Sequence, residues 1–122
     1  MLDHISVQVD DLDAAAGFYD AVLVPLGYQR LMEHDAAIGY GDRFPSFWLG
    51  RASDAIPNRP VHLAFVAPDR DAVEAFFAVA VTRGAEVLHE PRIWPEYHPG
   101  YFGAFVRDPD GNNVEAVHHT FG

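Results

Sequence analysis

An internal repeat constrains the fold of this chain of 122 residues more than any other feature. When the sequence is shifted so that His4 falls on His62, the strand pattern and the helix pattern that begin at His4 match those that begin at His62. The matched pairs are Ile5 with Leu63, Val7 with Phe65, Asp11 with Asp69, Asp13 with Asp71, Phe18 with Phe76, and Tyr19 with Phe77. Such a repeat predicts two copies of one supersecondary unit, each too small to bury its own sheet. We therefore expect two modules that pack together as one domain.

Each module is expected to begin with a strand followed by a helix. Residues 3–9 alternate polar and apolar side chains, which predicts a strand with one buried face. Asp10 and Asp11 offer an N-cap for a helix that runs to about Val24 and is ended by Pro25 and Gly27. The second helix has the same apolar spacing and stops at Gly84. Shorter strands are predicted at residues 28–33, 36–40, 46–49 and 86–89, and a proline-rich loop at residues 90–99.

The C-terminal part reads as a β-hairpin with strands at residues 101–106 and 113–117. In its turn, Asp108 starts a type I turn, Pro109 presets φ, and Gly111 closes the turn. Glu115 lies in the middle of the outgoing strand, on the face opposite Val114 and Ala116. A carboxylate buried alone costs several kcal/mol, so Glu115 is expected to face water or to meet a cation.

These elements predict two βαβββ modules of the α+β class. A single domain spans residues 1–122, with module one at 1–50, a linker at 51–60 and module two at 61–122. The linker contains two prolines and shows no periodicity.

The composition excludes several functions. Eighteen acidic residues against eight basic ones give a net charge of −10, which repels nucleic acids and anionic membrane surfaces. No apolar run approaches the ~20 residues of a membrane span, and the N-terminal residues do not resemble a signal peptide. Cysteine is absent, which fits a cytoplasmic protein and excludes disulfides and thiolate metal sites. We expect no nucleic-acid or membrane partner.

The repeat makes His4 and His62 equivalent, since both lie on the polar face of the first strand of their module. If the two strands are close in space, their imidazoles converge, and Glu115 would supply the anion. Two imidazoles and one carboxylate form a three-ligand site with open positions, which suits Fe(II), Mn(II), Zn(II), Co(II) or Ni(II). The alternative for either histidine alone is a half-buried polar residue without a metal.

Three stretches of the sequence form one pattern: DHISVQV with DLDAAAGFYD, VHLAFVAPDRDAVEAF, and above all HPGYFGAFVRDPDGNNVEAV. Through them the whole chain resembles the vicinal oxygen chelate superfamily of glyoxalases, extradiol dioxygenases, fosfomycin-resistance enzymes and bleomycin-resistance proteins. The resemblance implies that the two modules form a curled mixed-sheet cup with helices on the outside. It also implies a metal bound by His4, His62 and Glu115, which holds two adjacent oxygens of a small-molecule substrate, and a homodimer.

One departure from the family pattern bears on the reaction. In the glyoxalases of the family that this chain resembles, the last strand of module one supplies a fourth metal ligand. This ligand is a carboxylate that also acts as the base that moves the proton. Here that strand reads Ser46, Phe47, Trp48 and Leu49, with no carboxylate. The resemblance therefore favours dioxygenase chemistry with Fe(II) or Mn(II) over glyoxalase chemistry.

Further candidates lie close to these residues in the sequence. His98 and Tyr101 flank the start of the hairpin as possible acid and base catalysts. The loop at 90–99 carries Trp94 and Tyr97 and is a candidate lid. The candidates for substrate binding are the apolar Phe47, Trp48 and Phe102 and the cationic Arg43 and Arg92. Ordinary sheet packing, or a solvated side chain, is the alternative for each of them.

Three functions stay open on the sequence. The first is a metal-dependent dioxygenase, lyase or isomerase acting on a small molecule. The second is a metal-free protein that sequesters a ligand, as bleomycin-resistance proteins do. The third is a metal-free dimeric interaction module.

Overall fold

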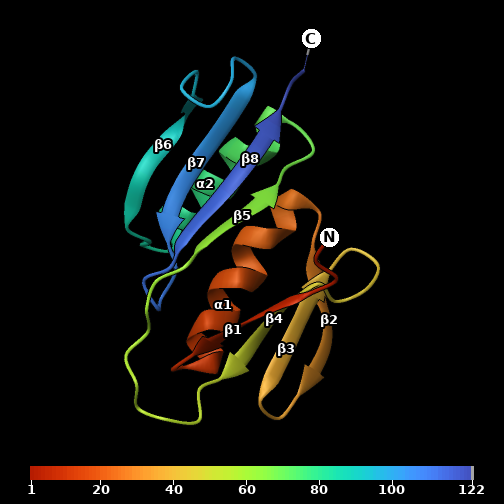
Figure 1. The fold of residues 1–122 in the computed structure, drawn as a ribbon, viewed down its shortest axis with the longest axis vertical. Coiled ribbons are helices and arrows are strands. Elements are labelled where there is room, and N and C mark those ends of the chain that lie inside the picture. Colours follow the sequence, from red (N-terminus) through yellow and green to blue (C-terminus); the bar gives the residue numbers. More distant parts are fainter. Residues whose placement is uncertain (122) are drawn as a thin grey trace.

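The computed structural model describes residues 1–121, and Gly122, the last residue of the predicted module two, lies outside the described part. The chain forms two four-stranded mixed sheets and two α-helices, which confirms the α+β class (Figure 1). Within residues 1–121, neither helix combines the length and the apolar character needed to cross a membrane.

Module one contains a short 3-10 helix besides its α-helix and four strands. Its elements are β1 (Ile5–Val9), α1 (Leu12–Leu23), η1 (Val24–Leu26), β2 (Gln29–His34), β3 (Ala37–Gly41) and β4 (Phe47–Arg51). The strand order in the sheet is β1-β4-β3-β2, with β1 parallel to β4 and the other neighbours antiparallel.

Module two repeats this plan. Its elements are β5 (His62–Val66), α2 (Arg70–Thr82), β6 (Val87–Ile93), β7 (Tyr101–Arg107) and β8 (Asn113–His119). The strand order is β5-β8-β7-β6, and β5 runs parallel to β8. The repeat in the sequence therefore corresponds to a repeat in strand order and direction.

The helices begin and end close to the predicted residues. The side chain of Asp11 accepts a hydrogen bond from the Ala14 amide at 3.0 Å, and Asp69 accepts one from Ala72 at 2.8 Å. These bonds satisfy amides at the N-terminus of each helix that have no partner within the helix. Gly27 and Gly84 follow the helices with φ of +92° and +81°, a conformation that glycine adopts without strain.

One predicted boundary differs from the structure. Strand β6 extends to Ile93 and includes Pro91, so the loop predicted at 90–99 is shortened to residues 94–100. Proline is tolerated there because β6 is the edge strand of its sheet, where an amide donor is not required. The ladder with β7 shifts register between His89 and Arg92.

The two modules share one hydrophobic core. The Tyr19 ring from α1 lies 4.9 Å from Phe47 of β4, and Phe47 lies 5.1 Å from Phe65 of β5. The Tyr19 hydroxyl donates a hydrogen bond of 2.6 Å to Asp108 in the turn between β7 and β8. Module one and the C-terminal hairpin are therefore held together by a polar contact as well as by apolar packing.

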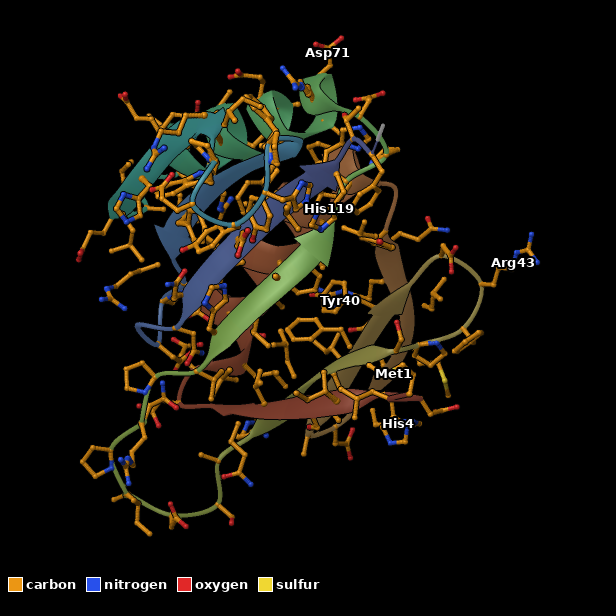
Figure 2. The ribbon with its side chains drawn as sticks, turned by 45° about the horizontal axis from the view of Figure 1, so that its top comes forward. Met1, His4, Tyr40, Arg43, Asp71 and His119 are labelled. Carbon is orange, nitrogen blue, oxygen red and sulfur yellow. The ribbon has the colours of Figure 1, made fainter. Side chains whose placement is uncertain are left out.

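The two sheets stay separate within the chain, because β1 and β5 are each an edge strand and do not pair with one another. A cavity of about 580 Å³ opens between the modules, and its lining includes Tyr40, Phe47 and Phe65. Figure 2 shows Tyr40 in the space between these two strands. The first strands of the modules therefore do not bring their histidines together by direct pairing.

Candidate functional site

Glu115 is the centre of the candidate site. Its side chain is only 1% exposed, in the middle of β8. One carboxylate oxygen, Oε1, lies 2.8 Å from Nε2 of His62, and the other, Oε2, accepts a short hydrogen bond from the Tyr101 hydroxyl. Because an ionised carboxylate only accepts hydrogen bonds, His62 carries its proton on Nε2. Glu115 is therefore buried and meets an imidazole and a phenol.

The sheet itself brings these three side chains together. The parallel ladder places His62 beside Asn113, two residues before Glu115 on the same face of β8. Tyr101 and Gly103 share the corresponding face of β7. A Cβ atom on Gly103 would lie 3.1 Å from Oε2 of Glu115 and 3.3 Å from the Tyr101 ring. The glycine therefore leaves the space that the carboxylate and the phenol occupy.

The environment keeps Tyr101 protonated. Burial, followed by the hydrogen bond to the Glu115 carboxylate and its negative charge, raises the pKa of the Tyr101 phenol well above its usual range. The hydroxyl therefore acts as a donor that fixes the orientation of Glu115.

An aromatic cluster centred on Phe105 lies beside His62. The Phe105 ring lies 5.8 Å from His62, 5.5 Å from His89 and 5.2 Å from Trp94. The indole nitrogen of Trp94 donates to the Gly103 carbonyl at 3.0 Å, which holds the loop 94–100 against this face. His89 was not predicted to lie here, since the register shift in β6 is not visible as a periodicity.

A second pair of histidines lies beside Tyr101. Nδ1 of His98 accepts a hydrogen bond from the Gly100 amide at 3.0 Å, so the proton of the neutral ring is on Nε2. That nitrogen lies 2.9 Å from Nδ1 of His119. The Tyr101 ring is 5.7 Å from His98 and 5.1 Å from His119. Strand alternation from Glu115 to His119 is the signal that would have placed His119 on this face.

His4 does not join this cluster. It precedes β1 in the other sheet, its side chain is 58% exposed, and its Nδ1 lies 2.7 Å from Asp3. Figure 2 shows His4 and His119 on different parts of the molecule. Within residues 1–121, no three side chains of His, Cys, Asp or Glu are grouped so that they would hold one metal ion. One chain thus brings together His62 and Glu115 but not the predicted triad.

The predicted substrate-binding residues are spread over the fold. Phe47 and Phe102 lie in the core, and the Arg70 guanidinium of α2 covers the Phe102 ring at 5.1 Å. Trp48 is half-buried and stacks with His34 at 6.0 Å. Arg43 projects from the loop after β3 into solvent (Figure 2).

Arg92 is the last member of this set, and it lies in the edge strand β6. It pairs with Gly103 in the ladder, and its guanidinium lies 3.4 Å from the centre of the Trp94 ring. It also forms an ion pair of 3.2 Å with Glu96.

Comparisons with known proteins agree with this fold. A family model of the glyoxalase/bleomycin resistance protein/dioxygenase superfamily matches residues 1–116. An uncharacterised Bacillus subtilis protein, YqjT, is 28% identical over 95% of this chain and 97% of its own. A glyoxalase/bleomycin resistance protein from Albidiferax ferrireducens has a TM-score of 0.83 and 28% identity, covering 96% of this chain and 98% of its own.

A lactoylglutathione lyase from Agrobacterium tumefaciens shares the fold, with a TM-score of 0.71 and 24% identity over 97% of this chain and 92% of its own. Together with the family match over nearly the full length, these similarities place the paired βαβββ modules in a known group. The chain belongs to the glyoxalase/bleomycin resistance protein/dioxygenase superfamily.

Proposed function

We propose that this protein is a metal-dependent enzyme that acts on a small molecule with two adjacent oxygens. The observation that carries the proposal is the Glu115 carboxylate, which is buried and faces the Nε2 atom of His62 at 2.8 Å. A buried carboxylate is costly unless it is paired, and carboxylate with imidazole is a common donor set for divalent metals. A metal held by both groups would take the place of the proton between them.

The third ligand is His4, which we propose comes from a second copy of the chain. Strands β1 and β5 are both edge strands, and the apolar side chains of Leu2 and Val66 near them are 76% and 58% exposed. Unpaired edges and exposed apolar side chains are usually covered in native proteins. A homodimer that places β1 of one copy near β5 of the other would cover both and bring His4 to His62 and Glu115.

A bound divalent metal would supply Lewis acidity to the two substrate oxygens, with Fe(II) or Mn(II) favoured and Zn(II), Ni(II) or Co(II) as alternatives. Tyr101 holds Glu115 in its orientation. His98 exchanges a proton with His119 through the contact of 2.9 Å between their ring nitrogens. Trp94 and Phe105 exclude water and contact the apolar part of the substrate. Strand β4 pairs with β1, and Trp48 and Gly50 of β4 carry no carboxylate. Because a glyoxalase would need a carboxylate ligand from this strand, its absence supports dioxygenase over glyoxalase chemistry.

The first test is the metal content of protein purified anaerobically without chelators. We expect near-stoichiometric metal in the wild type and a loss in His4→Ala, His62→Ala and Glu115→Gln. His34→Ala is the matched control, since His34 stacks on Trp48 and is not a proposed ligand. Unchanged metal content in Glu115→Gln would refute the assignment.

Co-expression of two defective chains tests whether a site spans two copies. In an equal mixture of His4→Ala and Glu115→Gln chains, half of the dimers are mixed, and each of these has one complete site. Metal content would therefore return to about a quarter of the wild-type value. No recovery would show that His4 and Glu115 do not serve the same site across the dimer.

The alternative is a metal-free protein that sequesters a ligand. Two observations favour it. Within one chain His4 is separate from His62 and Glu115, and the His62 imidazole and the Glu115 carboxylate already form a hydrogen bond with each other. In that case a ligand found by thermal-shift screening would bind equally well before and after chelator treatment. Loss of binding after chelation would exclude this function.

A further inference from the structure

We propose that Asn112 is a positioning residue that sets His62 against Glu115. This inference rests on the proposed function for its metal-binding readout. Asn112 is 1% exposed in the turn between β7 and β8. Its amide oxygen accepts hydrogen bonds of 3.0 Å from the Val61 backbone amide and from the Asn58 side chain. Val61 immediately precedes His62, so the Asn112 side chain holds the start of β5.

Asp108 determines the orientation of this amide. The Asn112 Nδ2 atom donates to Asp108 Oδ2 at 2.9 Å, and the Asn112 backbone amide donates to Asp108 Oδ1 at 2.9 Å. Reversing the side-chain amide would set its NH₂ group against two donors and its oxygen against a carboxylate. The observed orientation is therefore the one in which every group has a complementary partner.

The backbone amide and the carbonyl of Val61 are both held, one by the turn and the other by the first residue of β8. Its N–H donates to the Asn112 side chain, and its carbonyl accepts from the Asn113 amide at 2.9 Å. These bonds set the register of β5 on β8. A slip of one residue would turn His62 to the opposite face, away from Glu115. The DPDGN turn thus contributes to the site indirectly. Among the hydrogen bonds of residues 1–121, none joins a side chain of this turn to the His62 imidazole.

A reciprocal exchange tests this inference. Asn112→Asp places a carboxylate against that of Asp108, and Asp108→Asn places two amides together. The double variant restores one amide and one carboxylate, with the Val61 and Asn58 donors still facing an oxygen. We expect each single variant to bind Mn(II) about 10- to 100-fold more weakly than the wild type and the double variant to recover most of the affinity.

Two further variants separate positioning from general stability. Tyr19→Phe removes a hydrogen bond to Asp108 but leaves Asn112 and Val61 intact, so it should lower stability without weakening Mn(II) binding. Asn58→Ala changes an exposed linker residue and removes one donor from Asn112, so it should fold and weaken Mn(II) binding moderately. Affinity that falls equally in Tyr19→Phe, or a double variant as weak as the single ones, would overturn the inference.

A metal-free readout keeps this inference separate from the proposed function. The His62 ring lies 5.8 Å from Phe105, so nuclear Overhauser effects between the two rings report the position of His62. We expect them in the wild type and in Tyr19→Phe, and their loss in Asn112→Asp. A wild type that binds no Mn(II) would refute the proposed function, while these effects would still decide the role of Asn112. If the nuclear Overhauser effects between His62 and Phe105 persist in Asn112→Asp, the proposed positioning role of Asn112 is wrong.

Discussion

Replacing Tyr101 by phenylalanine removes one hydroxyl from the candidate site and leaves the ring in place. The Glu115 oxygen Oε2 would lose the donor that it has in the structure, while His62 would still contact Oε1. Water has little access to the carboxylate, which is buried. A hydrogen bond to a charged group contributes about 1.5–3 kcal/mol, so we expect Tyr101→Phe to lower the free energy of unfolding by about 2 kcal/mol.

The charge of Glu115 should account for much of that loss. In a Glu115→Gln background the same hydroxyl donates to a neutral amide, and the bond contributes only about 1 kcal/mol. A double-mutant cycle should therefore give a coupling free energy of about 1 kcal/mol between the two positions.

Urea unfolding of the metal-free protein measures the wild type, both single variants and the double variant. Protein concentration must be the same throughout, since association would shift the apparent stability. For a chain of this size, about 2 kcal/mol corresponds to a fall in Tm of roughly 6–10 °C. An effect of Tyr101→Phe below about 0.5 kcal/mol, or an equal effect in the wild-type and Glu115→Gln backgrounds, would refute the reasoning.

Three other predictions, each based on a substitution, test different parts of the structure. Burial and the nearby carboxylates of Asp108, Asp10 and Asp11 raise the pKa of Asp110. Ionised Asp110 therefore destabilises the fold at neutral pH. The stability that protonated Asp110 contributes is fully present only below the usual pKa range of aspartate. Asp110→Asn should therefore raise stability at about pH 7 by less than about 1 kcal/mol, and urea unfolding near about pH 3 should show no gain. Gly103→Ala should cost about 1–3 kcal/mol, because its Cβ would press on Glu115 and Tyr101, whereas Gly50→Ala, with its nearest contact at 3.5 Å, should change thermal stability little. Tyr19→Phe should cost about 1.5–3 kcal/mol in urea unfolding, since it removes a donor from the buried Asp108 carboxylate; a loss below about 0.5 kcal/mol would show that the contact does not join the modules.

The secondary structure could be predicted from the sequence because its signals are local. Asp11 and Asp69 cap the helices through amides three residues away, and Gly27 and Gly84 end them with positive φ. The turn at Asp108 closes with a hydrogen bond from the Gly111 amide at 3.0 Å, as its residues predict. The end of β6 was missed because Pro91 usually marks a loop, and only the position of the strand at a sheet edge makes it acceptable.

The two modules, and the strand faces on which His62 and Glu115 lie, followed from the sequence alone, since alternation and the repeat need no knowledge of distant contacts. Three-dimensional packing was needed to show that these two residues meet, that Tyr101 joins them, and that His4 lies directly before a strand of the other sheet. This difference arises because a repeat specifies each module but not how the edges of two sheets associate. The packing of the two modules depends on contacts between residues far apart in the chain, such as the hydrogen bond from the Tyr19 hydroxyl to Asp108, which no local pattern encodes.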